Sequence, residues 1–289
     1  PQAGGCCFTR TTTRLRPHAA SFVMTKPDWN RIFSNEKHRL HMALRRSDLT
    51  SYWRGSNGGL LKERKKWVEE NQSRCLGVCD DASLQVSLAL REIALLSEVD
   101  ESRIERLAVE VEPDWTLLSR ASGLWRIVAG AVVFPSSWAL NEKLGRPLFE
   151  VHGPIPGLNP TLGASIDIFL DSLTQFTAWE RWNWGLAADS ELNHHPSRNL
   201  PGLAPGVRIN NVWVRLENQH LCLLQCGLIL FGIRVSCHRL DKLVENVPGL
   251  APRIANSLET MMEDVALYKG VSDARAGIIS ALRAISGNS

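Results

Sequence analysis

The hydrophobic positions of this chain change their period twice. From residue 38 to about residue 110 they recur at helical spacing, with Asp81 placed to cap one helix. We expect core contacts from two sets of apolar residues on that helix: Leu84, Leu88 and Leu95, and Val86, Leu90 and Ile93. The first third of the chain is therefore expected to be mainly helical.

Between residues 124 and 236 the apolar runs become short, which is typical of strands. The expected strands cover residues 127–134, 147–152, 182–187, 212–221 and 228–235. A helix is expected between them at 161–176, and helical spacing returns after residue 236 with a buried stripe of Ile254, Leu258, Met261 or Met262, and Val265. Helices, an antiparallel sheet with an inserted helix, and helices again predict an α+β fold.

Composition adds few restrictions. The 289 residues are 44% hydrophobic and 22% charged, which is ordinary for a globular protein, and a net charge of +3 does not indicate nucleic acid. The apolar run at 228–233 is too short to cross a bilayer, and Arg126 interrupts the run at 124–134, so no transmembrane helix is expected. No Pro/Gly/Ser-rich linker divides the middle, so we expect one domain over residues 38–289.

Residues 1–37 are expected to be a disordered or mis-called N-terminal extension. Residues 1–27 carry four basic residues and no acid, which also resembles an organelle-targeting peptide, and this alternative stays open. The seven cysteines include no C-x-x-C pair, and Cys222 and Cys226 fall in an expected strand and loop. We therefore expect free thiols in a reducing, cytoplasmic setting and no zinc or iron-sulfur site.

Residues 134–157 read F-P-S-S-W-A-L-N-E-K-L-G-R-P-L-F-E-V-H-G-P-I-P-G and place one histidine, His152, among glycines and prolines. Pro154 and Pro156 fix their own φ angles and restrict the residues before them. The imidazole of His152 is therefore expected to have a defined direction, either as a hydrogen-bonded turn residue or as a ligand.

This segment resembles the signature of the heme-dependent oxidative N-demethylase family, alpha-subunit type. The resemblance continues in R-W-N-W at 181–184 and V-R-L-E-N-Q at 214–219, and more weakly in H-M-A-L-R at 41–45 followed by Trp53 and Arg64. It covers most of residues 38–270 and implies a PAS-like antiparallel sheet that holds heme b.

The resemblance also implies a chemistry and a set of partners. The reaction is the O2-dependent monooxygenase removal of an N-methyl group from a small secondary amine such as dimethylamine, with release of formaldehyde. Electrons come from reductase and ferredoxin-type subunits that carry FMN and an iron-sulfur cluster, because this chain has no G-x-G-x-x-G fingerprint or ferredoxin cysteine run.

Heme brings four nitrogen ligands and needs one axial residue, whereas a metal held by side chains needs three or four ligands. His152 alone suffices for heme, and the remaining histidines show no metal-ligand spacing. The positively charged candidates for binding heme propionates are Arg146, Arg181, Arg215 and Arg234, and each has a structural ion pair as its alternative. Trp184 and neighbouring tryptophans are candidate walls for the macrocycle or ordinary core residues.

Glu217 lies within an apolar run, where a carboxylate needs a partner. It is expected either to pair with Arg215 or Arg181, or to act as a catalytic group that binds a protonated amine or handles protons. Asn183 is expected to be structural or to hydrogen-bond a ligand on iron.

The chain departs from the family pattern after Glu217, where Asn218, His220, Cys222, Leu223 and Gln225 replace several arginines and a proline. Weak heme binding or a different electron donor would follow if those arginines serve propionates or the reductase interface, and His220 becomes a competing iron ligand. Two alternatives to the enzyme are a non-catalytic heme-binding or gas-sensing PAS-like protein and a metal-free interaction protein.

Overall fold

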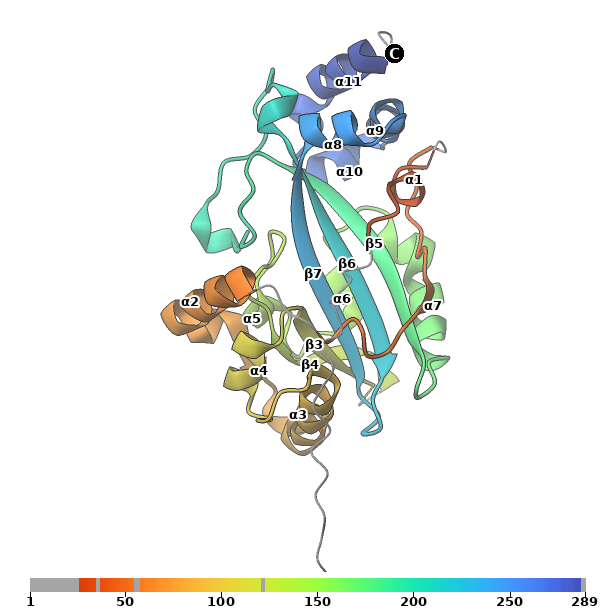
Figure 1. Cartoon of the computed structure of the whole chain (residues 1–289). Coiled ribbons are helices and arrows are strands. Elements are labelled where there is room, and N and C mark those ends of the chain that lie inside the picture. The colour runs from red at the N-terminus through yellow and green to blue at the C-terminus, as the bar shows by residue number, and fades with distance from the viewer. Residues whose placement is uncertain (1–25, 35–36, 55–57, 121–122, 287–289) are drawn as a thin grey trace, which may run out of the picture.

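The computed structural model describes residues 26–34, 37–54, 58–120 and 123–286. Within them, seven strands form one antiparallel sheet in the order β1-β5-β6-β7-β3-β4-β2. The strands are β1 (Arg45–Ser47), β2 (Leu76–Val78), β3 (Asp114–Ser119), β4 (Arg126–Ala131), β5 (Ala178–Ala187), β6 (Trp213–Leu223) and β7 (Ile229–Arg239). Figure 1 shows β5, β6 and β7 as the long central ribbons. The α+β prediction is confirmed.

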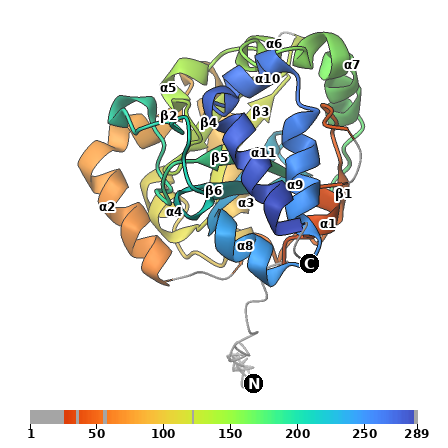
Figure 2. The same cartoon turned by 90° about the horizontal axis from the view of Figure 1, so that it is seen from above.

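Helices surround this sheet at three places. They are α1 (Trp29–Ile32), α2 (Gly58–Cys75), α3 (Ser83–Ser97), α4 (Ile104–Glu110), α5 (Leu140–Lys143), α6 (Leu148–His152), α7 (Leu158–Asp171), α8 (Leu240–Asn246), α9 (Leu250–Glu259), α10 (Glu263–Tyr268) and α11 (Ser272–Ser286). Seen from above in Figure 2, α9 and α11 lie side by side across the end of the sheet. Among the described residues, no helix has both the length and the apolar character needed to cross a membrane.

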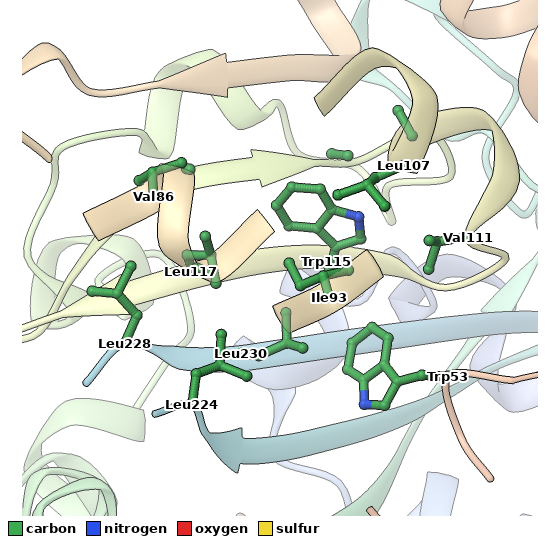
Figure 3. Packing of buried hydrophobic residues seen from close by; sticks show 14 of the residues in the cluster. Trp53, Val86, Ile93, Leu107, Val111, Trp115, Leu117, Leu224, Leu228 and Leu230 are labelled. Carbon is green, nitrogen blue, oxygen red and sulfur yellow. The ribbon is translucent and has the colours of Figure 1, made fainter. Parts of the chain in front are cut away.

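The core is divided into three clusters because the sheet carries apolar side chains on both faces. One face packs against α2, α3 and α4. Figure 3 shows Trp53, Trp115 and Leu117 among the buried side chains of this cluster. The opposite face packs against α5, α6 and α7, and the upper end of the ribbons packs against α8 to α11. The side chain of Phe33, directly after α1, is fully buried in this last cluster, so the folded part of the chain includes residues before 38.

Strand alternation decides which side chains share a face. In β6 the odd-numbered residues from Arg215 to Leu221 point one way and the even-numbered residues the other. The register with β5 pairs Asn183 with Glu217 and Arg181 with Gln219. These polar residues therefore lie on the face that also carries the cluster of α5, α6 and α7.

Several expectations about single elements were wrong. The expected strand at 147–152 is instead helix α6, because a short apolar run next to Pro147 carries no reliable period and only Pro147 itself bridges to a neighbouring strand. The central strand β3 was not expected, and neither were the three-residue strands β1 and β2. Asp81 does not cap α3; it lies in the preceding 3-10 turn and pairs with Arg126.

The two apolar sets of α3 lie on different sides of the helix. Val86 and Ile93 are buried and Leu90 is partly buried, as expected. The other set is exposed, with 76% of Leu84, 44% of Leu88 and 76% of Leu95 accessible, so the expected core contacts of these three leucines are wrong. A helix that packs on a sheet through one side cannot bury both sets. Later in the chain, Met261 is buried and Met262 is exposed, so Met261 is the methionine that belongs to the buried stripe with Ile254, Leu258 and Val265.

Candidate functional site

His152 ends helix α6 and precedes a turn, residues 153–157, that leads into α7. The turn is closed by a hydrogen bond from Ile155 N to the carbonyl oxygen of His152 at 2.9 Å. The imidazole is half-buried and has no hydrogen-bond partner among the residues that the structure describes. A turn histidine satisfied by hydrogen bonds was the ordinary alternative, and this ring is not of that kind.

Burial, together with nearby positive charge, favours the neutral form of the His152 ring. Burial lowers the pKa of His152, and the positive charge of Arg181 lowers it further, whereas Asp167 opposes the shift. A neutral imidazole with free ring nitrogens is the form that can donate a lone pair to a metal.

Glu217 is buried within a network of uncharged donors. Its Oε2 accepts hydrogen bonds from Asn183 Nδ2 at 3.2 Å and from Gln219 Nε2 at 2.7 Å, and its Oε1 accepts from the hydroxyl of Ser136. The expected direct pair with Arg215 or Arg181 is not formed; Ser136 lies between Glu217 and Arg215 and bonds both. Ser136 was missed as a site residue, because nothing in the F-P-S-S sequence indicates which strand the loop touches.

Arg215 has a structural task. Its guanidinium donates to Ser136 Oγ at 2.8 Å and to four backbone carbonyl oxygens in two loops: those of Phe134, Pro135, Glu191 and Leu192. These bonds hold the loop before α5 against the loop after β5 and leave little of the guanidinium for a ligand. Arg146 is 59% exposed and lies 3.8 Å from Glu150, one turn along the chain. Neither arginine is directed at His152 by these contacts.

Arg181 differs from both. Its side chain is partly buried, and its Nε is fully buried and has no hydrogen-bond partner in the described part of the chain. Burial lowers the pKa of Arg181 and the carboxylate of Glu217 opposes the shift, so the two groups are close enough to interact electrostatically. Arg181 therefore brings a positive charge within electrostatic range of both His152 and Glu217.

Trp184 lies on the other face of β5, since it pairs with Leu216 and its ring packs against Phe33 at a centroid distance of 4.7 Å. Its carbonyl oxygen accepts a hydrogen bond from Lys269 Nζ at 2.7 Å, and the ammonium lies 5.2 Å from the ring centroid. Burial lowers the pKa of Lys269 to about 8. Lys269 was missed because a lysine after a short helix carries no sequence signal of burial.

His220 and Arg234 are separated from His152 by the sheet. His220 is fully buried, stacks on Tyr52 at 4.4 Å between ring centroids, and has its Nε2 3.2 Å from the carbonyl oxygen of Asp48. Arg234 bonds the carbonyl oxygen of Tyr52 and pairs with Glu112. Competition by His220 for the same iron is therefore not supported by its position.

The residues on the face of His152 fit a heme better than a metal held by side chains alone. The described residues contain no group of three histidine, cysteine or carboxylate side chains that could hold a metal ion. They do contain the free imidazole of His152 and the unpaired, buried Nε of Arg181. Phe149, three residues before His152 in α6, and Tyr268, within electrostatic range of Glu217, are aromatic side chains that are 54% and 49% exposed. One axial nitrogen, a cation and apolar surface are what the macrocycle requires.

A neutral histidine without a hydrogen-bond partner in the described chain, near the polar face of an antiparallel sheet, is a candidate ligand for a prosthetic group. The fold and this site therefore indicate a protein that binds such a group. The family is shown by comparison: residues 61–279 match the family model for haem-dependent oxidative N-demethylase, alpha subunit-like, and the chain belongs to this family. The match confirms the expected family. The description as an alpha subunit implies an assembly with other subunits.

Proposed function

We propose that this protein is a heme-binding oxidoreductase subunit that removes an N-methyl group from a small secondary amine such as dimethylamine in an O2-dependent reaction. The observation that carries the proposal is the half-buried imidazole of His152, which has no hydrogen-bond partner in the described chain and lies near the desolvated Arg181. The proposed unit is a single domain that extends over residues 38–289 and includes the buried segment around Phe33, and we propose that its sheet is PAS-like.

His152 is the residue that we propose would bind the heme iron. Bound heme b would supply the oxygen chemistry, and the residues of this chain set its surroundings. Burial and the charge of Arg181 keep the imidazole unprotonated, so no proton has to leave before it can bind a metal. Arg181 is the proposed cofactor-binding cation, whereas the bonds of Arg215 support a positioning task in the neighbouring loops.

Glu217 is the proposed catalytic acid-base group. Its carboxylate accepts bonds from Asn183, Gln219 and Ser136, which fix its orientation without neutralising its charge. A protonated amine near this carboxylate would gain a charge-assisted hydrogen bond and could give up its proton to it. Asn183 acts by holding Oε2 of Glu217 in place.

Two of the positions at which the chain departs from the family pattern face away from Glu217. Asn218 and His220 belong to the even-numbered face of β6, opposite Glu217, and both contact the segment around Tyr52. Arginines at these two positions would not face His152, whereas Leu223 lies on the odd-numbered face and packs with the cluster of α5, α6 and α7. The electron donors are proposed to be reductase and ferredoxin-type subunits with FMN and an iron-sulfur cluster, in a reducing cytoplasm that keeps cysteines such as Cys75 and Cys222 free.

A visible absorption titration with hemin tests the proposal. We expect a Soret band in the wild type and in the control His195→Ala, which alters a histidine on the loop after β5, and no band in His152→Ala. Added imidazole should restore the band in His152→Ala, because the free ligand can occupy the position of the lost side chain. An unchanged band in His152→Ala, with circular dichroism showing a folded protein, would exclude His152 as the ligand and remove the basis of the proposed function.

A further inference from the structure

Two partly buried cations near Glu217 form no salt bridge with a carboxylate of the described residues. The Nε of Arg181 has no hydrogen-bond partner among these residues. Lys269 directly follows α10, and its ammonium donates a hydrogen bond to the carbonyl oxygen of Trp184, which lies three residues after Arg181 in β5. An ammonium has three N–H donors, and the backbone bond to Trp184 uses one of them. The structure therefore holds cationic donors with unused hydrogen-bonding capacity along one strand.

The place of Lys269 follows from the pairing of β5. Strand β1 pairs only with residues 178–180 of β5, so in the described chain residues 181–187 form an edge of the sheet. Lys269 covers this edge by bonding the carbonyl oxygen of Trp184 and by placing its charge over the indole ring. These contacts fix the ammonium in one position, as a binding group requires.

Glu217 forms no direct bond with either cation. Its carboxylate is already held by three uncharged donors, and it lies beyond salt-bridge distance of Arg181 and Lys269. Burial lowers the pKa of Lys269, the carboxylate of Glu217 raises it, and the positive charge of Arg181 lowers it. Glu217 therefore offsets part of the repulsion between the two cations, but it leaves their unused N–H donors without an acceptor in the described chain.

We propose that Lys269 and Arg181 together bind a carboxylate group of a ligand at the edge of β5. In the heme-loaded protein this carboxylate is a heme propionate, and that identification rests on the function proposed above. Charge-assisted hydrogen bonds from an ammonium and a guanidinium recognise a carboxylate whether it belongs to a propionate or to a small free acid. The experiment separates these two sources.

The other candidate cations are less suited to this task. Arg215 donates its hydrogen bonds to two loops of the protein, and Arg146 is exposed and close to Glu150. A surface arginine would bind a propionate only weakly, because water screens the interaction. Lys269 and Arg181 are both desolvated, so each contact with an anion is stronger there.

The first test compares hemin with hemin dimethyl ester, in which the carboxylates are masked. Lys269→Met should weaken binding of hemin about tenfold, the effect of losing one charge-assisted bond, and leave the binding of the ester unchanged. Lys269→Arg should restore most of the affinity, and the exposed Lys242→Met is the matched control with wild-type affinity for both. An equal loss for hemin and its ester, or no loss for either, would overturn the proposal.

A second measurement keeps the inference separate from the heme proposal. In heme-free protein, sodium propionate should raise the melting temperature above that in sodium chloride of equal ionic strength, and Lys269→Met should abolish the difference. Propionate could stabilise the wild type in this way although hemin does not bind through His152. In that case the site binds a free carboxylic acid, the proposed function is refuted, and the carboxylate site is retained. If propionate has no specific effect and the hemin titration shows no dependence on Lys269, the carboxylate site is refuted.

Discussion

At the scale of single residues, the candidate site depends on which polar groups have partners. Glu217 has three donors and Arg215 has five acceptors, whereas the imidazole of His152 and Nε of Arg181 have none among the described residues. The sequence identified His152, Arg181, Asn183 and Glu217 through a family resemblance. It could not show their partners, because Ser136 and Lys269 reach them only through the tertiary fold.

Glu217→Gln tests the proposed acid-base group. The amide keeps the size of the side chain but loses the negative charge, so amine turnover should fall by about tenfold or more while heme content stays unchanged. Formaldehyde release from dimethylamine, with heme quantified in the same samples, measures both quantities. Glu150→Gln, which alters a partly exposed acid on the same helix as His152, is the control and should keep the wild-type rate. A wild-type rate of formaldehyde release in both variants would show that Glu217 is not the acid-base group.

Lys269→Met also has an effect on stability, with a sign fixed by its pKa. Burial lowers this pKa from 10.5 to about 8, so between these values the unfolded chain binds more protons than the folded one and stability rises with pH. Below pH 8 the folded protein bears the cost of a buried charge, about 3 kcal/mol. The variant should be more stable than the wild type at pH 7 and gain less stability from pH 8 to 10.5.

Urea unfolding at pH 7, 9 and 10.5 measures this difference. Lys242→Met removes an exposed lysine and should keep the wild-type pH dependence, which corrects for the other groups that titrate in this range. A Lys269→Met variant that is less stable at pH 7 and follows the wild-type slope would contradict the assigned burial.

At the scale of elements, hydrophobic periodicity predicted the long helices and strands and failed to predict the short ones. The strands at 212–221 and 228–235 were predicted close to β6 and β7, which have eleven residues each. The five-residue α6 was read as a strand, and the six-residue β3, although central, was missed. Runs of this length contain too few repeats to separate the two periods, and pairing with β4 and β7 decides the outcome.

Gly232→Ala tests the packing of β7 against the segment before α2. A Cβ at Gly232 would lie 2.5 Å from the ring of Trp53 and 2.7 Å from that of Tyr52, and the ring of Trp53 is buried. We expect a loss of about 1–3 kcal/mol from overpacking. Gly185→Ala in β5 is the matched control, since nothing lies within 4 Å of a Cβ there. Chemical denaturation of both variants should separate them, and equal stabilities would show that the rings can move away.

At the scale of the whole molecule, the helical first third is joined to the sheet by a buried ion pair. Arg64 of α2 is fully buried, donates to the carbonyl oxygen of Ala108 at 3.1 Å, and pairs with Asp114 of β3 at 2.6 Å. The resemblance drew attention to Arg64, and the structure gives it this structural role. The antiparallel α+β architecture followed from the order of patterns along the chain, but the order of strands in the sheet did not, because it depends on contacts between distant segments.

Asp114 connects this ion pair to the candidate site. Its Oδ1 accepts hydrogen bonds from Arg64 and from Val133 N at 2.9 Å, and its Oδ2 accepts from Phe134 N at 2.8 Å. The loop that begins there carries Ser136, which bonds Glu217. One carboxylate therefore fixes α2, β3 and the start of the loop that orients the proposed acid-base group.

Asp114→Asn removes the charge and replaces one acceptor by a donor that faces backbone N–H groups. Breaking one side of a buried ion pair leaves the other charge uncompensated, so we expect a loss of about 3–5 kcal/mol in the free energy of unfolding. Glu98→Gln breaks the surface pair with Arg54 and should change stability by about 0.5 kcal/mol or less. Urea denaturation at pH 7 measures both, and a loss at Asp114 no larger than that at Glu98 would show that the ion pair does not hold the helical part to the sheet.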